Sequence, residues 1–445
     1  MSNDPYILIT ADTHAGGSHA QYREYLDPKY RDAFDAWRGG YKNPAQEHYG
    51  SKKLRNWDLD IRTKDQNSQG VVGEVVFPNT VPPFYRKSIV TAQPPTAEHY
   101  EYALAGIRAH NRWLKDFCAE DSVRRAGIGL MLPNNLDEAI KDIEFIADAR
   151  LRGGVLLPLI PPDCTWLKPL YDPAWDRVYA AIQDHDLVIN QHSGQGSPNY
   201  GEGPVPEALW ISEVTFFCQA GFRHLLMSGA YEKFPKLKYI LTESGCGWVG
   251  DMLKALDRIH MGFVHGSIGE MNYQGMEWVL KDKPSEYAAR NCWYGASFPS
   301  LADLDGIDEI GEDRVLWGND YPHYEGTFPY NLESLRLTFA NISEGRRRKL
   351  LGENAAKLYK FDLDKLKPLA AQHGPTPEQV STPLPRDQIP RDSACYLFQN
   401  ALHGAQGLDR HPGDSRFCRR LRGRLPAAAK RAQALHGQHP FQHRR

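Results

Sequence analysis

The chain has 445 residues, of which 41% are hydrophobic and 24% charged, and its formal net charge is −2. This length exceeds that of an average domain, and a chain of this size can bury a core without disulfides or structural metals. The near-neutral charge argues against a nucleic-acid-binding protein. No apolar run approaches the ~18 residues needed to span a membrane.

The cysteines and the N-terminal segment bear on the compartment. Seven cysteines are scattered along the chain without a Cys-x-x-Cys pair: Cys118, Cys164, Cys218, Cys246, Cys292, Cys395 and Cys418. The first ten residues show no basic region followed by a long apolar run, as a secretory signal would. The pattern predicts reduced, mostly buried thiols in a cytoplasmic protein.

Short apolar, β-branched runs alternate with helical patterns over the first 360 residues. The eight candidate strands are Ile7–Thr10, Val71–Phe77, Ala126–Leu132, Gly154–Pro158, Leu187–Asn190, Tyr239–Thr242, Cys292–Tyr294 and Val315–Gly318. Most of them lack clean alternation, which is typical of parallel strands covered on both faces. Segments with one apolar helical face lie between them, including one that Asn134 or Asn135 would cap.

Eight strands alternating with helices predict an α/β protein with a closed (β/α)₈ barrel, long βα-loop insertions and a C-terminal extension. An open, doubly wound sheet is the alternative, but no Gly-x-Gly-x-x-Gly motif follows an early strand. The loops at residues 16–69, rich in aromatic residues, and 79–95 are long enough to form lids on the catalytic face.

The composition predicts three regions: a barrel over residues 1–362, a Pro-rich extended strap or linker over 363–390, and a basic tail over 391–445. The tail contains 11 Lys and Arg residues and three Asp residues, which gives it a net charge of +8. The rest of the chain has a net charge of −10. A basic arm for nucleic acid is one interpretation of this tail. We favour a disordered tail that cannot bury enough apolar surface to fold.

Polar side chains end four of the expected strands. The first ends in Asp12-Thr13-His14, the fifth in Gln191-His192-Ser193, the sixth in Thr242-Glu243-Ser244 and the eighth in Asn319-Asp320-Tyr321-Pro322-His323. In a barrel these ends converge on one mouth. Side chains two apart on an extended strand lie on the same side, so Asp12 and His14 can bind one ion.

His192 and Asp320 can complete such a site, because imidazole nitrogen and carboxylate oxygen suit zinc, manganese or iron. Each residue also has a structural explanation: a turn or helix cap for Asp12 and Asp320, or a buried histidine satisfied by its neighbours for His192. The four strand ends together favour metal binding. Glu74 lies two residues from Val72 and two from Val76, so the three side chains share one face of the expected strand. Glu74 is therefore a further candidate for the barrel interior.

The segments ITADTH, INQHSG, FPKLKYILTESGCGW and VLWGNDYPH resemble the amidohydrolase-related (amidohydrolase 2) branch of the metal-dependent amidohydrolase superfamily, over residues 6–360. The resemblance implies a (β/α)₈ barrel and a ligand set that falls on Asp12, His14, His192 and Asp320. It also implies either a hydrolase or a non-oxidative decarboxylase of a small carboxylic acid. Many members carry a histidine at the position of Glu243 in this chain.

A carboxylate at position 243 can bridge two metal ions. Alternatively, it binds no ion and only forms a hydrogen bond to a metal-bound water or to His192. We therefore expect one or two divalent ions (zinc, iron or manganese), with Glu243 as a fifth candidate ligand. Our main prediction is a metal-dependent hydrolase of a small substrate that contains an amide, lactone, ester or thioester. Asp320 would act as the general base, and His323 would stabilise the oxyanion or serve as a second acid.

Two alternatives differ in chemical class. In a non-oxidative decarboxylase of a small (aromatic) carboxylic acid, a protonated Asp320 or His323 would deliver a proton to the carbon that loses CO₂. In a non-catalytic scaffold, the basic tail would be the interaction arm. We expect a small-molecule substrate and neither nucleic acid nor membrane as a partner. Exposed apolar residues on barrel helices are compatible with a homodimer.

Overall fold

The computed structural model describes residues 4–42 and 50–403. Its centre is an eight-stranded sheet in the order β1-β2-β3-β4-β5-β6-β9-β10, in which every neighbouring pair is parallel. The strands are β1 (Leu8–Ala15), β2 (Val71–Pro78), β3 (Arg125–Leu130), β4 (Gly154–Leu156), β5 (Val188–His192), β6 (Lys238–Thr242), β9 (Cys292–Ser297) and β10 (Val315–Gly318).

The last strand returns to the first and closes the barrel. Beyond the end of β10, the amide of Asp320 donates to the carbonyl of Asp12 (3.0 Å), and the amide of His14 donates to the carbonyl of Tyr321 (2.7 Å). Gly318 permits this approach, because a β-carbon there would lie 2.7 Å from the β-carbon of Asp12. The predicted (β/α)₈ barrel is therefore confirmed, and the open sheet is wrong.

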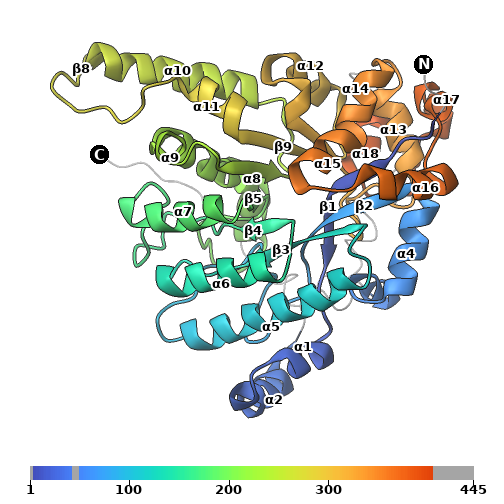
Figure 1. Cartoon of the computed structure of the whole chain (residues 1–445), viewed down its shortest axis with the longest axis horizontal. Helices are drawn as coiled ribbons and strands as arrows, with labels where there is room; N and C mark the ends of the chain where they lie inside the picture. The colour runs from blue at the N-terminus through green and yellow to red at the C-terminus, as the bar shows by residue number, and fades with distance from the viewer. Residues whose placement is uncertain (1–3, 43–49, 404–445) are drawn as a thin grey trace, which may run out of the picture. The chain divides into compact units, whose positions relative to one another are not determined.

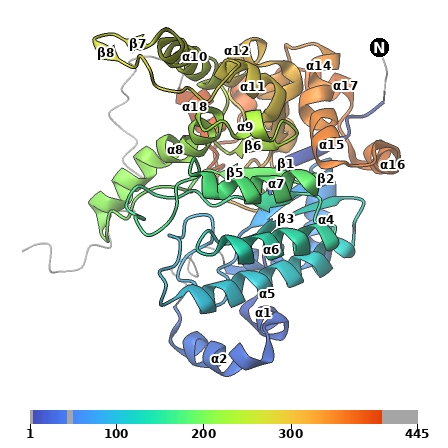
Figure 2. The same ribbon diagram turned by 60° about the vertical axis from the view of Figure 1, so that its left-hand side comes forward.

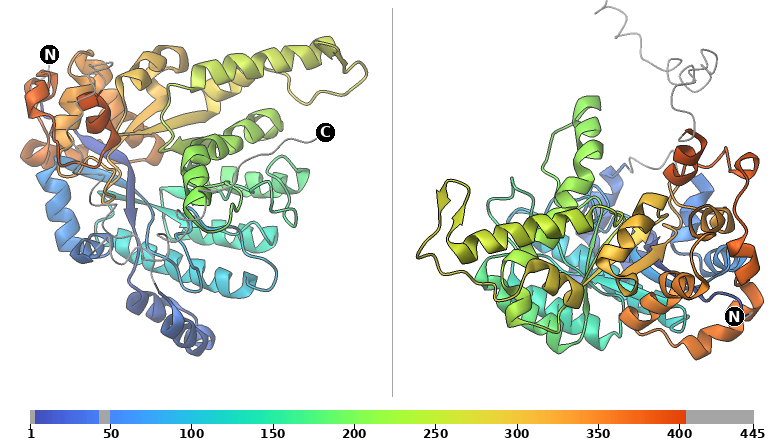
Figure 3. Two further views of the ribbon diagram at one scale, coloured as in Figure 1. Left: turned by 180° about the vertical axis from the view of Figure 1, so that it is seen from behind. Right: turned by 90° about the horizontal axis from the view of Figure 1, so that it is seen from above.

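Helices surround the strands (Figure 3, right). They are α1 (His19–Tyr25), α2 (Arg31–Gly40), α4 (Leu59–Ser68), α5 (Tyr100–Ala119), α6 (Leu136–Asp148), α7 (Asp176–Asp184), α8 (Pro204–Met227), α9 (Ala230–Lys233), α10 (Val249–His265), α11 (Pro284–Asn291), α12 (Leu301–Ile310), α13 (Asn331–Phe339), α14 (Glu344–Arg348), the π-helix η5 (Lys349–Glu353), α15 (Asn354–Tyr359), α16 (Leu363–His373), α17 (Pro377–Ser381) and α18 (Tyr396–His403). A short hairpin of β7 (Ser267–Ile268) and β8 (Met271–Asn272) follows α10.

The apolar runs form two layers of core. Inside the barrel, a buried cluster takes a residue from seven strands, and Trp293 of β9 packs against it: Ile9, Val75, Ile128, Leu156, Val188, Ile240 and Leu316. A second cluster lies between the strands and helices such as α5, α6 and α7, which follow one another along the outside of the barrel (Figure 2). Asn135 caps α6, as predicted, by accepting from the amides of Asp137 and Glu138.

The insertion between β1 and β2 contains α1, α2 and α4. Part of its aromatic content forms a small cluster of its own, in which Phe34 and the partly buried Trp37 pack with Ala105 and Ala109 of α5. Its last helix, α4, lies against β2 and supplies the polar side chains described below. The insertion therefore supports the carboxyl end of β1 from outside the barrel.

The strap that we expected to be extended is partly helical. Thr376 accepts a hydrogen bond from the amide of Gln379 and forms a capping box, and Pro377 occupies the first turn of α17. Proline is well suited to that position, because its missing N–H has no helical partner there. Asp362 caps α16 in a similar way. The Pro-rich composition thus marks helix starts instead of an extended segment.

The predicted tail begins with ordered structure. Helix α18 lies within it, and Phe398 of that helix is fully buried. Disorder beginning at residue 391 is therefore wrong for residues 391–403, because an apolar anchor was overlooked there. The remainder of the predicted tail, residues 404–445, lies outside the described residues.

Two observations bear on the expected compartment. The six described cysteines are buried and form no disulfide, and Cys418 lies outside the described residues. Among the described residues, no helix has both the length and the apolar character needed to cross a membrane. The cytoplasmic location stays a prediction.

Candidate metal centre

A bulge in β1 orients the first two candidate ligands. Thr10 pairs with Glu74 and Thr13 with Val76, so β1 advances three residues while β2 advances two. The extra residue lies directly before the Asp12-Thr13-His14 segment. Bulges of this kind re-aim side chains beside active sites. Asp12 and His14 then face one another, with Nε2 of His14 3.3 Å from Oδ1 of Asp12.

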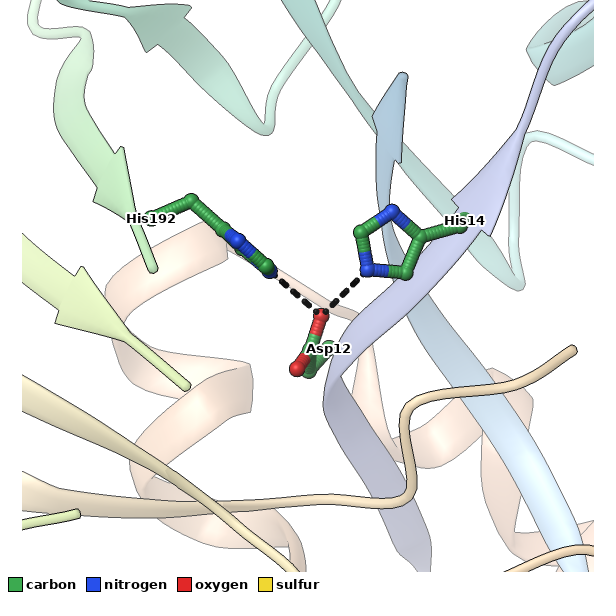
Figure 4. A group of neighbouring side chains, drawn as sticks. All are labelled: Asp12, His14 and His192. Atoms are coloured by element: carbon green, nitrogen blue, oxygen red, sulfur yellow. Dashed lines mark hydrogen bonds and ion pairs between the residues drawn. The ribbon is translucent and has the colours of Figure 1, made fainter. Parts of the chain in front are cut away.

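His192, the last residue of β5, meets Asp12 from the other side (Figure 4). Its Nε2 lies 3.3 Å from Oδ1 of Asp12. Its Nδ1 lies 2.8 Å from the carbonyl oxygen of Ser193, and Nδ1 of His14 lies 3.2 Å from that of Pro78. A carbonyl only accepts, so Nδ1 of each ring carries a proton, and Nε2 of each ring faces Asp12.

Asp320 approaches the same point from the loop after β10. Its φ of 55° places it in the left-handed region, which is uncommon for a residue with a side chain and is typical of functional sites. Oδ1 of Asp320 lies 3.2 Å from Nε2 of His14 and 2.8 Å from Nδ1 of His323. The rings of His14 and His323 stack with centroids 4.0 Å apart.

Glu243 lies beside this group. It follows β6 directly, also in the left-handed region with a φ of 58°. Its Oε2 is 3.4 Å from Nδ1 of His192, the nitrogen that faces away from Asp12. The potential ligand atoms form three overlapping groups: Asp12, His14 and His192; His14, Asp320 and His323; and Glu243, Asp320 and Glu325. The structure thus brings together the five predicted metal ligands and His323.

Opposite charges dominate the centre of the site. Burial by itself lowers the pKa of His14, but the facing Asp12 and Asp320 carboxylates outweigh it and raise that pKa to about 10. Burial also opposes ionisation of Asp12, but His192 and His14 hold its pKa well below the ordinary value. Without a metal, this arrangement therefore holds a proton where a cation could bind.

Burial raises the pKa of Glu243 well above its ordinary value, and the neighbouring Asp320 and Asp12 raise it further. His323 shows the opposite balance. Burial lowers its pKa, but Asp320 outweighs burial and raises it. The carboxylic acid and the imidazole on the rim can thus both hold protons close to Asp320.

The donor atoms fit a cation. Nε2 of His14, Oδ1 of Asp320 and Nδ1 of His323 are buried and have ion-pair contacts but no well-aligned hydrogen bond, and the buried Oδ2 of Asp320 has no hydrogen-bond partner in the described chain. Buried polar atoms without partners are costly and uncommon. Here the ligand atoms form two groups of three that share His14, one with Asp12 and His192 and one with Asp320 and His323. A divalent cation held by imidazole nitrogens and carboxylate oxygens would satisfy them together.

A buried ionic network supports β1 from behind. Arg62 of α4 donates from Nη2 to Oε2 of Glu74 (2.6 Å) and to Oγ1 of Thr13 (2.9 Å), and from Nη1 to the carbonyl of His14 (2.8 Å). Nε of Arg125 also contacts Glu74, at 3.2 Å. Glu74 therefore faces α4 and not the barrel interior that we expected, because the guanidinium groups that neutralise it lie on that side.

Several residues of the site were not predicted. Ser297 ends β9 and donates to Oδ2 of Asp12 at 2.5 Å, and Asn79 accepts from Nε2 of His323 at 3.0 Å. Both follow strands of the barrel, so their position was a signal that we did not use. Arg62 carried no signal, since it lies 48 residues from His14 in the chain. Glu325 was not predicted either, because the fold of the loop after β10 brings it to the site.

Comparisons with known proteins agree with this geometry. A family model described as amidohydrolase matches residues 86–361, more than half of the chain, which confirms the family resemblance. Gamma-resorcylate decarboxylase from Polaromonas sp. (strain JS666) is 25% identical over 268 residues, which cover 57% of this chain and 76% of that protein.

Two solved structures share the fold. 5-Carboxyvanillate decarboxylase from Sphingomonas paucimobilis has a TM-score of 0.57 and 21% identity, and the match covers 80% of this chain and 100% of that chain. The second is dihydroxybenzoic acid decarboxylase from Polaromonas sp. JS666, with bound manganese and the inhibitor 2-nitroresorcinol. Its TM-score is 0.57 and its identity 17%, and the match covers 80% of this chain and 97% of that chain.

These comparisons support a divalent metal, but they contradict our main functional prediction. The relatives are named as decarboxylases, so hydrolysis of an amide, lactone, ester or thioester is wrong as the leading activity. The donor set is common to both kinds of chemistry, so the ligand residues alone could not distinguish the two reactions. The comparisons agree with the decarboxylase alternative.

Proposed function

The chain belongs to the amidohydrolase family, and we propose that it is a metal-dependent, non-oxidative decarboxylase of hydroxylated aromatic carboxylic acids. The observation that carries the proposal is that Asp12, His14 and His192 form one group of potential ligand atoms at the carboxyl ends of the strands, and that Asp320 lies 3.2 Å from the shared His14. The relatives named for such acids supply the substrate class.

Manganese is the metal that we propose. Two neutral imidazoles and two carboxylates form a mixed nitrogen and oxygen set that suits Mn²⁺ as well as zinc or iron. Manganese is also the ion bound in two decarboxylases of the same fold. When bound, the cation would supply positive charge that attracts the substrate's carboxylate and adjacent hydroxyl oxygen to the mouth of the barrel.

Asp12, His14 and His192 would hold the ion and keep its position fixed. The hydrogen bond from Ser297 orients the Asp12 carboxylate, and the Ser193 and Pro78 carbonyls fix the two rings. Such outer hydrogen bonds set both the tautomer and the direction of a ligating imidazole. The strands themselves are rigid, so the geometry does not depend on a flexible loop.

The pair formed by Asp320 and His323 would supply the proton. Nδ1 of His323 lies 2.8 Å from Oδ1 of Asp320, and Asn79 holds the opposite side of the ring. Asp320 raises the pKa of His323, which favours a proton on this imidazole beside the carboxylate. His323 would transfer that proton to Asp320, and Asp320 would pass it to the substrate.

The reaction is balanced without an oxidant or a water nucleophile. The proton adds to the ring carbon that bears the carboxylate, and that carbon becomes tetrahedral. The bond to the carboxylate then breaks, its electron pair returns to the ring, and CO₂ leaves. Solvent returns one proton to His323. A hydroxyl next to the carboxylate would make protonation easier, because it donates electron density to the ring.

The test uses full-length protein loaded with Mn²⁺ and a panel of 2,6-dihydroxybenzoate, 5-carboxyvanillate and 2-hydroxybenzoate, with benzoate as the substrate that lacks a hydroxyl. We expect equal amounts of CO₂ and the corresponding phenol, with one deuterium at the vacated carbon in D₂O. Asp320→Asn should lower the rate by about a hundredfold or more. No CO₂ from any acid of the panel would contradict the proposal.

A further inference from the structure

We propose that Phe298 forms an aromatic wall of the substrate site and that the ring of an aromatic acid packs against it. Phe298 directly follows Ser297, which ends β9 and donates to Oδ2 of Asp12. In the barrel β9 lies between β6 and β10, so Phe298 stands between Glu243 and Asp320 around the rim. The inference rests on the proposed function in that it requires an aromatic substrate at this mouth.

The backbone of Phe298 is strained. Its φ of 37° lies in the left-handed region, which is an outlier for a bulky side chain. Six other described residues with a side chain have a positive φ. Three of them lie at the ends of helices and one in the loop after β2: Arg150, Asp186, Lys360 and Phe84. The other two are Glu243 and Asp320 of the site. Strain of this kind costs free energy and is typical of functional sites.

The neighbouring strands β6 and β9 end in the same way. The last residue of each strand pairs with a glycine of the next strand, which is Gly295 for β6 and Gly318 for β9. The residue that follows the strand then donates its amide to the carbonyl of that glycine, at 3.0 Å for Glu243 and 2.9 Å for Phe298. Glu243 and Phe298 therefore hold equivalent positions, one strand apart.

Glu243 shows where this backbone conformation directs a side chain. Alternation along β6 would place Glu243 on the helix side with Tyr239 and Leu241, which belong to the cluster between the strands and the helices. Its carboxylate instead lies 3.4 Å from Nδ1 of His192, in the mouth of the barrel. We expect the same left-handed step after β9 to turn Phe298 towards the mouth.

The packing of Phe298 agrees with this placement. Alternation would place it with Tyr294 and Ala296 of β9, which belong to the cluster between the strands and the helices. Within the described chain, however, Phe298 belongs to neither that cluster nor the one inside the barrel, and its side chain is only partly buried. Its ring thus has apolar surface available, and a planar ligand ring is a favourable partner for such a surface.

The test measures binding and not turnover. Full-length protein loaded with Mn²⁺ is titrated by calorimetry with 2-nitrophenol, which has an aromatic ring but no carboxylate to lose, and with malonate, which binds metals but has no ring. We expect Phe298→Leu to bind 2-nitrophenol about tenfold more weakly than the wild type, because a ring pair contributes up to about this factor. Its malonate affinity and metal content should be unchanged, and Phe298→Tyr should retain both affinities.

The matched control is Phe145→Leu, which replaces a partly exposed phenylalanine of α6 and should leave both affinities unchanged. Equal binding of 2-nitrophenol by Phe298→Leu and the wild type would overturn the inference. A wild type that binds malonate but not 2-nitrophenol would also overturn it. So would an equal loss of malonate affinity in Phe298→Leu, because Phe298 would then act through the metal centre.

A glycine variant tests the backbone argument. Glycine adopts a positive φ without strain, so Phe298→Gly should unfold at a temperature no lower than Phe298→Leu does. A lower transition would contradict the left-handed conformation from which the placement follows.

The two proposals fail separately. Release of CO₂ from the acid panel, together with equal 2-nitrophenol affinities in the wild type and Phe298→Leu, would overturn the aromatic wall and leave the proposed function intact. A protein that releases no CO₂, but whose 2-nitrophenol affinity falls in Phe298→Leu, would do the reverse.

Discussion

Replacing Arg62 by methionine should destabilise the protein by several kcal/mol and weaken metal binding at the same time. The Arg62 side chain is 0% exposed, and that of its partner Glu74 is 6% exposed. Removing one member of a buried ion pair leaves an uncompensated charge and typically costs about 3–5 kcal/mol. Arg125 and Gln66 still contact Glu74, so we expect the lower end of this range.

The pKa of Glu74 gives an independent estimate of how much its pairing with arginine contributes to the free energy of unfolding. Burial would raise its pKa, but Arg62 and Arg125 outweigh burial and lower it from 4.5 to about 2. At about 1.4 kcal/mol per pKa unit, this difference corresponds to roughly 3 kcal/mol at neutral pH. Because the folded-state pKa is depressed, this stability is present above pH ~4.5 and is lost as the pH falls towards ~2.

The assay is guanidinium unfolding of metal-free protein at pH 7, with Arg23→Met as the matched control. Arg23 forms a two-bond pair with Asp35 on the surface, where solvent screens the charges, so its loss should lower the free energy of unfolding far less than the loss of Arg62. Arg62 also holds the His14 carbonyl, so its loss should lower Mn²⁺ affinity about tenfold or more. Equal destabilisation by both variants, or unchanged affinity, would refute the reasoning.

Three further predictions concern the site. Since His14 has a pKa of about 10 without metal, Mn²⁺ uptake should release a proton, and affinity should rise about tenfold per pH unit between pH 6 and 9, as measured by calorimetry in buffers of different ionisation enthalpy. Asn79→Leu removes the acceptor of His323 and should lower the turnover rate about tenfold without changing metal content. Gly318→Ala should reduce metal content, because its β-carbon would collide with that of Asp12.

Each of these predictions has a result that contradicts it. Metal uptake without proton release would show that His14 is already neutral. An Asn79→Leu protein with the wild-type rate would show that the His323 ring needs no support. For the glycine, Gly345→Ala is the control, because a β-carbon there has no atom within 4 Å. Gly318→Ala with the same metal content as that control would contradict the close-packing argument.

The strands were predictable because apolar runs bounded by glycine and polar residues leave few alternatives. The runs at 71–77 and 315–318 match β2 and β10 closely. The positions of Asp12, His14, His192 and Asp320 at the mouth followed from the barrel, since the carboxyl ends of parallel strands meet there. Their use as metal ligands stays a prediction that the geometry supports.

Other features depend on contacts between distant segments and left no local pattern. The bulge in β1 is visible only in its pairing with β2. The Arg62 and Glu74 pair lies beneath the site, and Glu74 was misplaced because alternation along a strand does not say which face meets the helix layer. The strap was misjudged because proline at a helix start resembles proline in an extended segment. The reaction could not be read from ligands that serve both chemistries.

Pulsed electron paramagnetic resonance of the Mn²⁺-loaded protein tests the central claim most directly. Nitrogen coupling should be present in the wild type, and it should lose one imidazole contribution in His14→Gln and another in His192→Gln. Asp12→Asn and Asp320→Asn should bind the ion more weakly. Absent nitrogen coupling, or coupling unchanged in both histidine variants, would contradict the assignment of these strand-end residues to one metal centre.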